Sequence, residues 1–129
     1  MKETERMATL LLGTYEKDAW HGPSVKEVGA TVHASAASKR LHNSHSIIEL
    51  VNHMTAWRNF VIKRLSGDDT YELTEEQNFP PSADWDQSLA ALEKSQAQLI
   101  ASIQQFPPEK LADKVPGHTY NFYTLIHGI

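Results

Sequence analysis

The sequence predicts an all-α protein, and three observations support this prediction. Apolar residues recur every three or four positions in several long segments, as they do on one face of a helix. Ser-x-x-Glu motifs stand at the start of two of these segments, where such motifs cap helices. We find no useful stretch of strand-like alternation between apolar and polar residues, no internal repeat and no Gly-rich phosphate loop.

The composition fits a single domain over residues 1–129. A chain of 129 residues with 40% hydrophobic content can bury a core of its own. Its formal net charge of −4 argues against a nucleic-acid partner, because phosphate binding needs a concentrated basic surface. The chain has no cysteine, so His, Asp and Glu are the available metal ligands.

The hydropathy pattern predicts a cytoplasmic protein without a membrane partner. No segment of the sequence reaches the roughly 18 to 20 consecutive apolar residues that cross a bilayer. The N-terminal segment carries charges before Leu10 and lacks the continuous apolar core of a signal peptide.

Two helices are expected in the N-terminal third. The first covers residues 3–19 and ends before the His21-Gly22-Pro23 turn. Its inward-facing residues are Met7, Leu10, Leu11, Thr14 and Tyr15. A shorter second helix starts at Ser24, which forms a capping box with Glu27. Its apolar edge consists of Val25, Val28 and Val32.

The clearest helix starts at Ser46, which forms a second capping box with Glu49, and ends before Gly67. Its buried stripe is expected to contain Ile47, Leu50, Val51, Met54, Trp57, Val61 and Leu65. The polar residues after Gly67, followed by Pro80-Pro81, predict a long crossover loop without a regular element.

The next helix covers Trp85 to Phe106, with an apolar seam that Gln96 interrupts. A buried amide needs hydrogen-bond partners, and a bond between helices is favoured over a ligand contact. A last helix begins near Thr119. Its apolar pattern still runs at Ile129 without a cap, so we expect a chain cut short inside a helix.

His53 is the strongest candidate for chemistry. It lies about 100° from the centre of the apolar face of its helix, beside Trp57, where an imidazole can reach a cavity between helices. The residues alone leave two readings open, a ligand or base and a satisfied histidine at the edge of the core. Glu49, four residues earlier, could orient or co-ligate His53, although it also serves the capping box.

Two further histidines deserve comparison with His53. His45 lies two turns before it on a similar face and could reach the same cavity, although a cap-proximal histidine is the favoured reading. His127 is alone on the last helix, where a structural role is more common. The sequence contains no HxxxH pair, the usual spacing of two metal ligands on one helix.

Three motifs carry a family resemblance. They are WHGPS at residues 20–24, ELVNHMTAW at residues 49–57 and YTLIHG at residues 123–128. With them the chain resembles the DinB-like superfamily, the damage-inducible proteins that include YfiT-like metal-dependent hydrolases. The resemblance runs from about Leu10 to Ile129. It implies a four-helix bundle of the DinB/YfiT type, with the long crossover loop between the second and third long helices.

The resemblance also implies a divalent metal, zinc or nickel, held by three histidines. One ligand position matches His53, with Glu49, Trp57 and His45 as the residues that would surround it. The other two ligands form an HxxxH pair beyond the HG dipeptide, which here is His127-Gly128, one residue before the end of the chain. A metal is therefore expected only if the missing C-terminal ligands are present. An omitted C-terminal segment is favoured over a truncated molecule, and His127 is a weaker replacement ligand.

The implied activity is that of a metal-dependent hydrolase or a low-molecular-weight-thiol S-transferase. A small-molecule substrate, which for the transferase includes such a thiol, and a homodimer are the expected partners. The alternative is a non-catalytic, stress-related helical module that serves binding or dimerisation.

Overall fold

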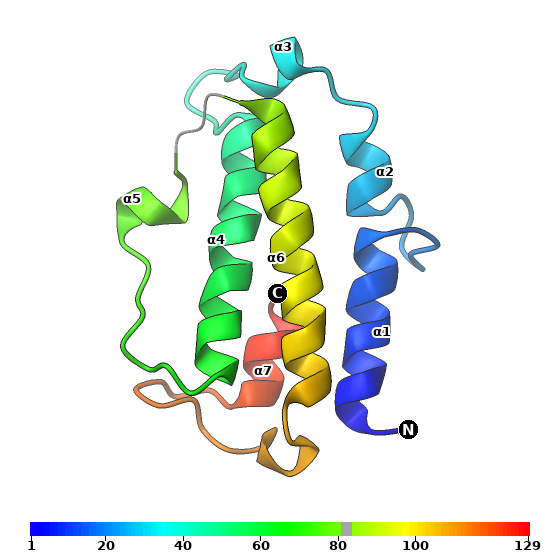
Figure 1. Cartoon of the computed structure of the whole chain (residues 1–129). Coiled ribbons are helices and arrows are strands. Elements are labelled where there is room, and N and C mark those ends of the chain that lie inside the picture. The colour runs from blue at the N-terminus through cyan, green and yellow to red at the C-terminus, as the bar shows by residue number, and fades with distance from the viewer. Residues whose placement is uncertain (81–83) are drawn as a thin grey trace.

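The computed structural model describes residues 1–80 and 84–129, and these residues form helices and no strands (Figure 1). The elements are α1 (Glu3–Tyr15), α2 (Val25–Gly29), α3 (Ala34–Ala37), α4 (Ile47–Leu65), α5 (Glu75–Asn78), α6 (Trp85–Gln105), the 3-10 helix η1 (Pro108–Lys110) and α7 (Phe122–His127). The all-α prediction is confirmed. Pro81, which was expected to help break regular structure, lies outside the described residues.

The capping residues of α4 and α2 are where the sequence places them. The Ser46 hydroxyl accepts a hydrogen bond from the backbone N–H of Glu49 at 3.2 Å, and the Glu49 carboxylate accepts one from the backbone N–H of Ser46. Ser24 and Glu27 form the same reciprocal pair at the start of α2. Gly67 follows α4 with a φ of +92°, a conformation that glycine adopts without steric cost.

Two helix boundaries differ from the prediction. The first helix ends at Tyr15 instead of residue 19, because the Ser24 hydroxyl donates to the Glu16 carbonyl and Asp18 takes a left-handed φ of 60°. The last helix begins at Phe122 instead of near Thr119. An isolated bridge between Lys114 and Asn121 keeps the preceding residues in a turn.

The expected structureless crossover contains the short helix α5, which is a correction to the prediction. Thr74 caps it, because its hydroxyl accepts from the Gln77 backbone N–H while the Gln77 amide oxygen accepts from the Thr74 backbone N–H. This Thr-x-x-Gln pair is a capping box with glutamine in place of glutamate.

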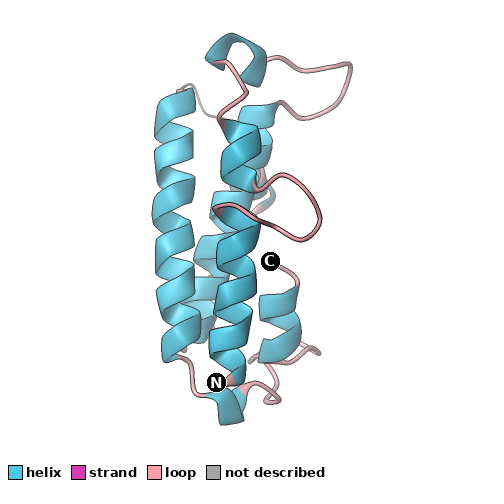
Figure 2. Ribbon diagram, turned by 90° about the vertical axis from the view of Figure 1, so that its right-hand side faces the viewer, coloured by secondary structure: helices cyan, strands magenta, loops and turns pink. Residues whose placement is uncertain are grey.

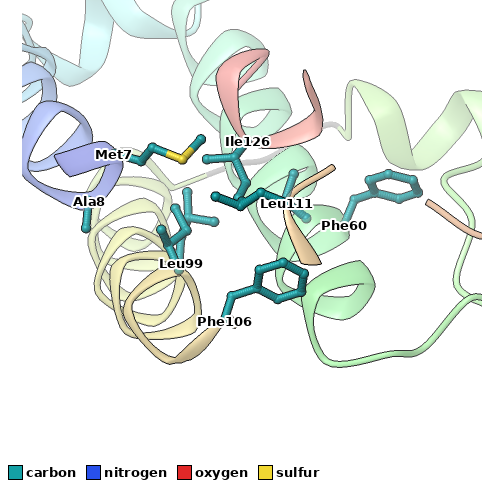
Figure 3. Packing of buried hydrophobic residues seen from close by; sticks show 9 residues of the cluster. Met7, Ala8, Phe60, Leu99, Phe106, Leu111 and Ile126 are labelled. Atoms are coloured by element: carbon teal, nitrogen blue, oxygen red, sulfur yellow. The ribbon is translucent and has the colours of Figure 1, made fainter. Parts of the chain in front are cut away.

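Helix α6 packs against both α4 and α1 (Figure 1). Apolar side chains fill the space between the three helices. Leu99 and Ile103 of α6 are fully buried in the larger cluster. Figure 3 shows this cluster, to which α1 contributes Met7, α4 contributes Phe60 and α7 contributes Ile126. Burying a side chain of this size stabilises the fold by roughly 1.5–3 kcal/mol.

Gln96 links the three long helices through polar contacts inside the core. Its amide oxygen accepts from Nε of Arg58 on α4 at 2.9 Å, and its amide nitrogen donates to the carbonyl of Leu11 on α1 at 3.2 Å. The prediction of a hydrogen-bonded amide between helices is confirmed. Because the amide is buried, these bonds fix the relative register of α1, α4 and α6.

Helix α7 lies on the opposite side of α1 from α6 (Figure 2). It packs against α4 and contributes Ile126 to the core. Three side chains that were expected to face inward are exposed. They are Leu10, which is 65% exposed, Leu50 and Ile47. No helix in the described ranges is both long and apolar enough to cross a bilayer.

Candidate functional site around His53

His53 lies on α4 and faces the segment that contains α5. Its side chain is half-buried, and its Nδ1 atom is 2.8 Å from the backbone carbonyl oxygen of Asn78. A carbonyl oxygen only accepts hydrogen bonds, so Nδ1 carries the proton of the neutral ring. No group in residues 1–80 and 84–129 bonds to Nε2.

An aromatic stack holds the ring of His53 in place. The Phe79 ring lies 4.1 Å from the His53 ring at an interplanar angle of 8°. It also lies 3.8 Å from the His45 ring at 2°. One phenyl ring therefore contacts both histidines. Stacking on Phe79 limits the directions in which the His53 ring can turn.

Trp57 supports the same arrangement from one turn further along α4. Its indole Nε1 donates to the side-chain oxygen of Asn78 at 2.7 Å, and its ring meets that of His53 edge-on, with centroids 6.3 Å apart. Asn78 thus binds Trp57 through its side chain and His53 through its backbone. The expected proximity of Trp57 and His53 is confirmed.

Glu49 contacts His45 and not His53. Its carboxylate accepts two bonds of 2.6 Å from the guanidinium of Arg40 and one of 3.0 Å from Nδ1 of His45. These donors, with Arg40 first, hold the pKa of Glu49 well below its ordinary value. No contact therefore supports the prediction that Glu49 orients His53 directly. Glu49 instead binds His45.

His127 lies in a different part of the molecule. It is exposed on α7 and lines a groove beside α1 that does not include His53. Across the two described ranges, no three His, Asp or Glu side chains come together in a set able to hold a metal ion. The chain therefore offers one imidazole nitrogen at His53, which is fewer ligands than a protein metal site needs.

Sequence reasoning missed Asn78, Phe79 and Arg58. The Thr74-x-x-Gln77 capping box could have indicated a helix next to Asn78, whereas nothing local indicates which part of α4 that helix would meet. Arg58 could have been noticed as a charge four residues after Met54, inside the apolar stripe of α4.

The comparison with known protein families gives a match over almost the whole chain. The model of the DinB superfamily matches residues 3–127. Searches of the curated proteins and of the solved structures gave no significant match.

Proposed function

The chain belongs to the DinB superfamily, and on that premise we propose that it takes part in binding a divalent metal, with His53 as one ligand. Zinc and nickel are the proposed ions, since both accept imidazole nitrogen. The site would act on a small molecule in the cytoplasm.

One observation carries this proposal, the hydrogen bond from His53 Nδ1 to the Asn78 carbonyl. Metal-binding histidines commonly donate their second ring N–H to a backbone carbonyl or a carboxylate, which fixes the tautomer and the direction of the ring. His53 has this arrangement before any metal is considered. Phe79 and Trp57 add rigidity on one face and one edge of the ring.

The described residues supply one ligand and do not by themselves fit a metal. We therefore propose that the remaining ligands come from outside residues 1–129, as an HxxxH pair of histidines. Helix α7 would lead toward them, and His127 is not needed as a ligand. No catalytic step is assigned to the residues described here.

The reaction class proposed is that of a metal-dependent hydrolase or a low-molecular-weight-thiol S-transferase. In either case a divalent metal supplies acidity, by lowering the pKa of a bound water or thiol. The absence of cysteine from the sequence is compatible with a thiol supplied by a cosubstrate.

Elemental analysis of the full gene product, purified without added metal, tests the proposal. We expect close to one zinc or nickel ion per chain in the wild type and loss of the ion in His53→Ala. His33→Ala removes an exposed histidine at the start of α3 and should leave the metal content unchanged. Metal retained by the His53 variant, or a wild type without metal, would contradict the proposal.

A second candidate function is a non-catalytic module that binds another copy of the chain. An apolar groove of about 280 Å³ between α2 and α4 favours it, since Val28 and Leu50 on its walls are about half exposed. A metal-free protein that sediments as a homodimer, with equal stability in wild type and His53→Ala, would support this candidate.

A further inference from the structure

Tyr15, the last residue of α1, is a buried phenol whose hydroxyl forms no hydrogen bond within residues 1–80 and 84–129. The residue is 5% exposed. Leaving a buried polar group without a partner costs free energy, so most buried hydroxyls bond to another protein group, to water or to a ligand. The Tyr15 hydroxyl therefore needs a partner that the described residues do not supply.

The hydroxyl opens onto a groove between α2 and α6. In the described ranges, the fully enclosed side-chain atoms that lack a partner belong to Thr4 and Arg64, so the Tyr15 hydroxyl keeps contact with open space. Tyr15 lines a groove of about 350 Å³. This volume lies in the range of small-molecule sites.

The groove is formed by residues 15–30 and 86–93. Helix α6, which forms one wall, lies on the opposite side of α1 from the chain end marked C in Figure 2. His53 does not line the groove. The groove is therefore separate from the candidate metal site and from α7.

The walls of the groove are largely apolar. Val25 of α2 and Leu89 of α6 contribute aliphatic surface. A Cβ added to Gly29 would lie 3.6 Å from the Leu89 side chain, so α2 and α6 are close together at this point. Ala30 and Ala90, which also line the groove, have small side chains that leave space between the helices. The walls therefore suit a hydrocarbon group.

The charges at the rim are mostly negative. Nζ of Lys26 lies 3.1 Å from a carboxylate oxygen of Glu16 and 3.2 Å from one of Glu93. Asp86 lines the same groove. One ammonium group thus faces three carboxylates, and the N-terminal end of α6 near Asp86 adds only about half a positive charge. The rim therefore attracts a cation more strongly than an anion.

Glu93 is the charged residue that acts most strongly on the phenol. Burial raises the pKa of Tyr15, and the negative charge of Glu93 raises it further. The phenol is therefore neutral at pH 7, and its oxygen can accept an N–H bond. An ammonium group has several N–H donors, so one such group can bond to the Tyr15 oxygen and to the Glu93 carboxylate together.

We propose that this groove binds a small organic cation with one primary ammonium group and an apolar body. The ammonium donates to the Tyr15 oxygen and the Glu93 carboxylate, and the body lies against Val25 and Leu89. A metal ion fits less well, because these walls offer hydrocarbon in place of oxygen ligands. An anion fits less well, because the carboxylates at the rim repel it.

A titration followed by backbone amide chemical shifts tests the proposal on the intact protein. The probes are 3-phenylpropylamine, 3-phenyl-1-propanol and 3-phenylpropanoate, which share one skeleton and differ in charge at pH 7. We expect wild type to bind the amine about tenfold more tightly than the alcohol, and the carboxylate most weakly. The largest shifts should fall on residues 25–30 and 86–93.

Tyr15→Phe removes the hydroxyl and keeps the ring. It should weaken amine binding about fivefold, as the loss of one hydrogen bond allows. The urea midpoint should stay the same, because the described residues make no hydrogen bond to this hydroxyl. Tyr123→Phe removes a hydroxyl on α7, outside the groove, and serves as the matched control.

Two variants on α6 test the rim and the walls. Glu93→Gln changes an exposed side chain, so it should fold normally and lose most of the preference for the amine over the alcohol. Ala90→Leu should weaken the binding of all three probes by filling the groove. Ala91→Leu, at an exposed neighbouring position outside the groove, should leave binding unchanged.

Several results would overturn the proposal. They are no binding of the amine to wild type, equal affinity for the three probes, tighter binding of the carboxylate, and shifts confined to other parts of the chain. A preference for the amine that is unchanged in Glu93→Gln would also overturn it, and this result does not depend on how Tyr15→Phe folds.

Discussion

Glu49 illustrates how one side chain can serve both a helix end and a candidate site. Its carboxylate caps α4 through Ser46 and, through His45, supports the ring that stacks on Phe79. The Glu49 side chain is about one-tenth exposed, and the positive charge of Arg40 offsets the burial of its negative charge. A neutral amide at this position would keep the shape and lose the charge.

The free energy of unfolding is therefore expected to depend on pH through Glu49. Its pKa is lowered in the folded state, so the unfolded chain binds more protons and this part of the stability is lost as the pH falls below about 5. In Glu49→Gln that acid-sensitive part should be absent. Urea unfolding between pH 3 and pH 7 measures it, and Glu109→Gln, which changes an exposed carboxylate, serves as the control. Identical pH slopes in wild type and Glu49→Gln would refute the assignment.

Among the elements, the two helix-associated glycines predict opposite effects of the same substitution. Gly13 lies inside α1, and a Cβ added there would meet nothing within 4 Å. Gly13→Ala should stabilise the protein by about 0.5–1 kcal/mol. Gly67 ends α4 at a φ of +92°, so Gly67→Ala should destabilise it by about 1 kcal/mol. Chemical denaturation of both variants checks the pair. Equal changes of the same sign in the free energy of unfolding would contradict the assigned end of α4.

At the scale of the elements, the sequence predicted the features that depend on nearby residues in the chain. The start of α4 at Ser46 follows from a capping box, and the role of Gln96 follows from one amide in an apolar seam. Helix α5 was missed because it is a single turn with no apolar periodicity. Leu50 was expected to be buried, because periodicity identifies an apolar face without identifying what covers it.

The candidate site could be predicted only in part for the same reason. The position of His53 on the edge of α4 follows from helical geometry, and its partner Trp57 lies one turn away. The contact with Asn78 joins residues 25 positions apart. It depends on the path of the crossover, which the sequence of that segment does not specify.

At the scale of the whole molecule, α4 lies between two groups of polar contacts. His53 lies on its side toward α5, and Arg58 lies on its side toward α1 and α7. Helix α6 packs along the same helix and holds Arg58 through Gln96, so one rigid element supports both.

The central claim is that the fold itself prepares the imidazole of His53 as a metal ligand. A long-range proton–nitrogen correlation spectrum of the histidine rings at neutral pH tests it most directly, with His53→Gln used to assign the signals. We predict that the neutral form of the His53 ring carries its proton on Nδ1 and leaves Nε2 bare. A neutral ring with its proton on Nε2 would contradict the claim.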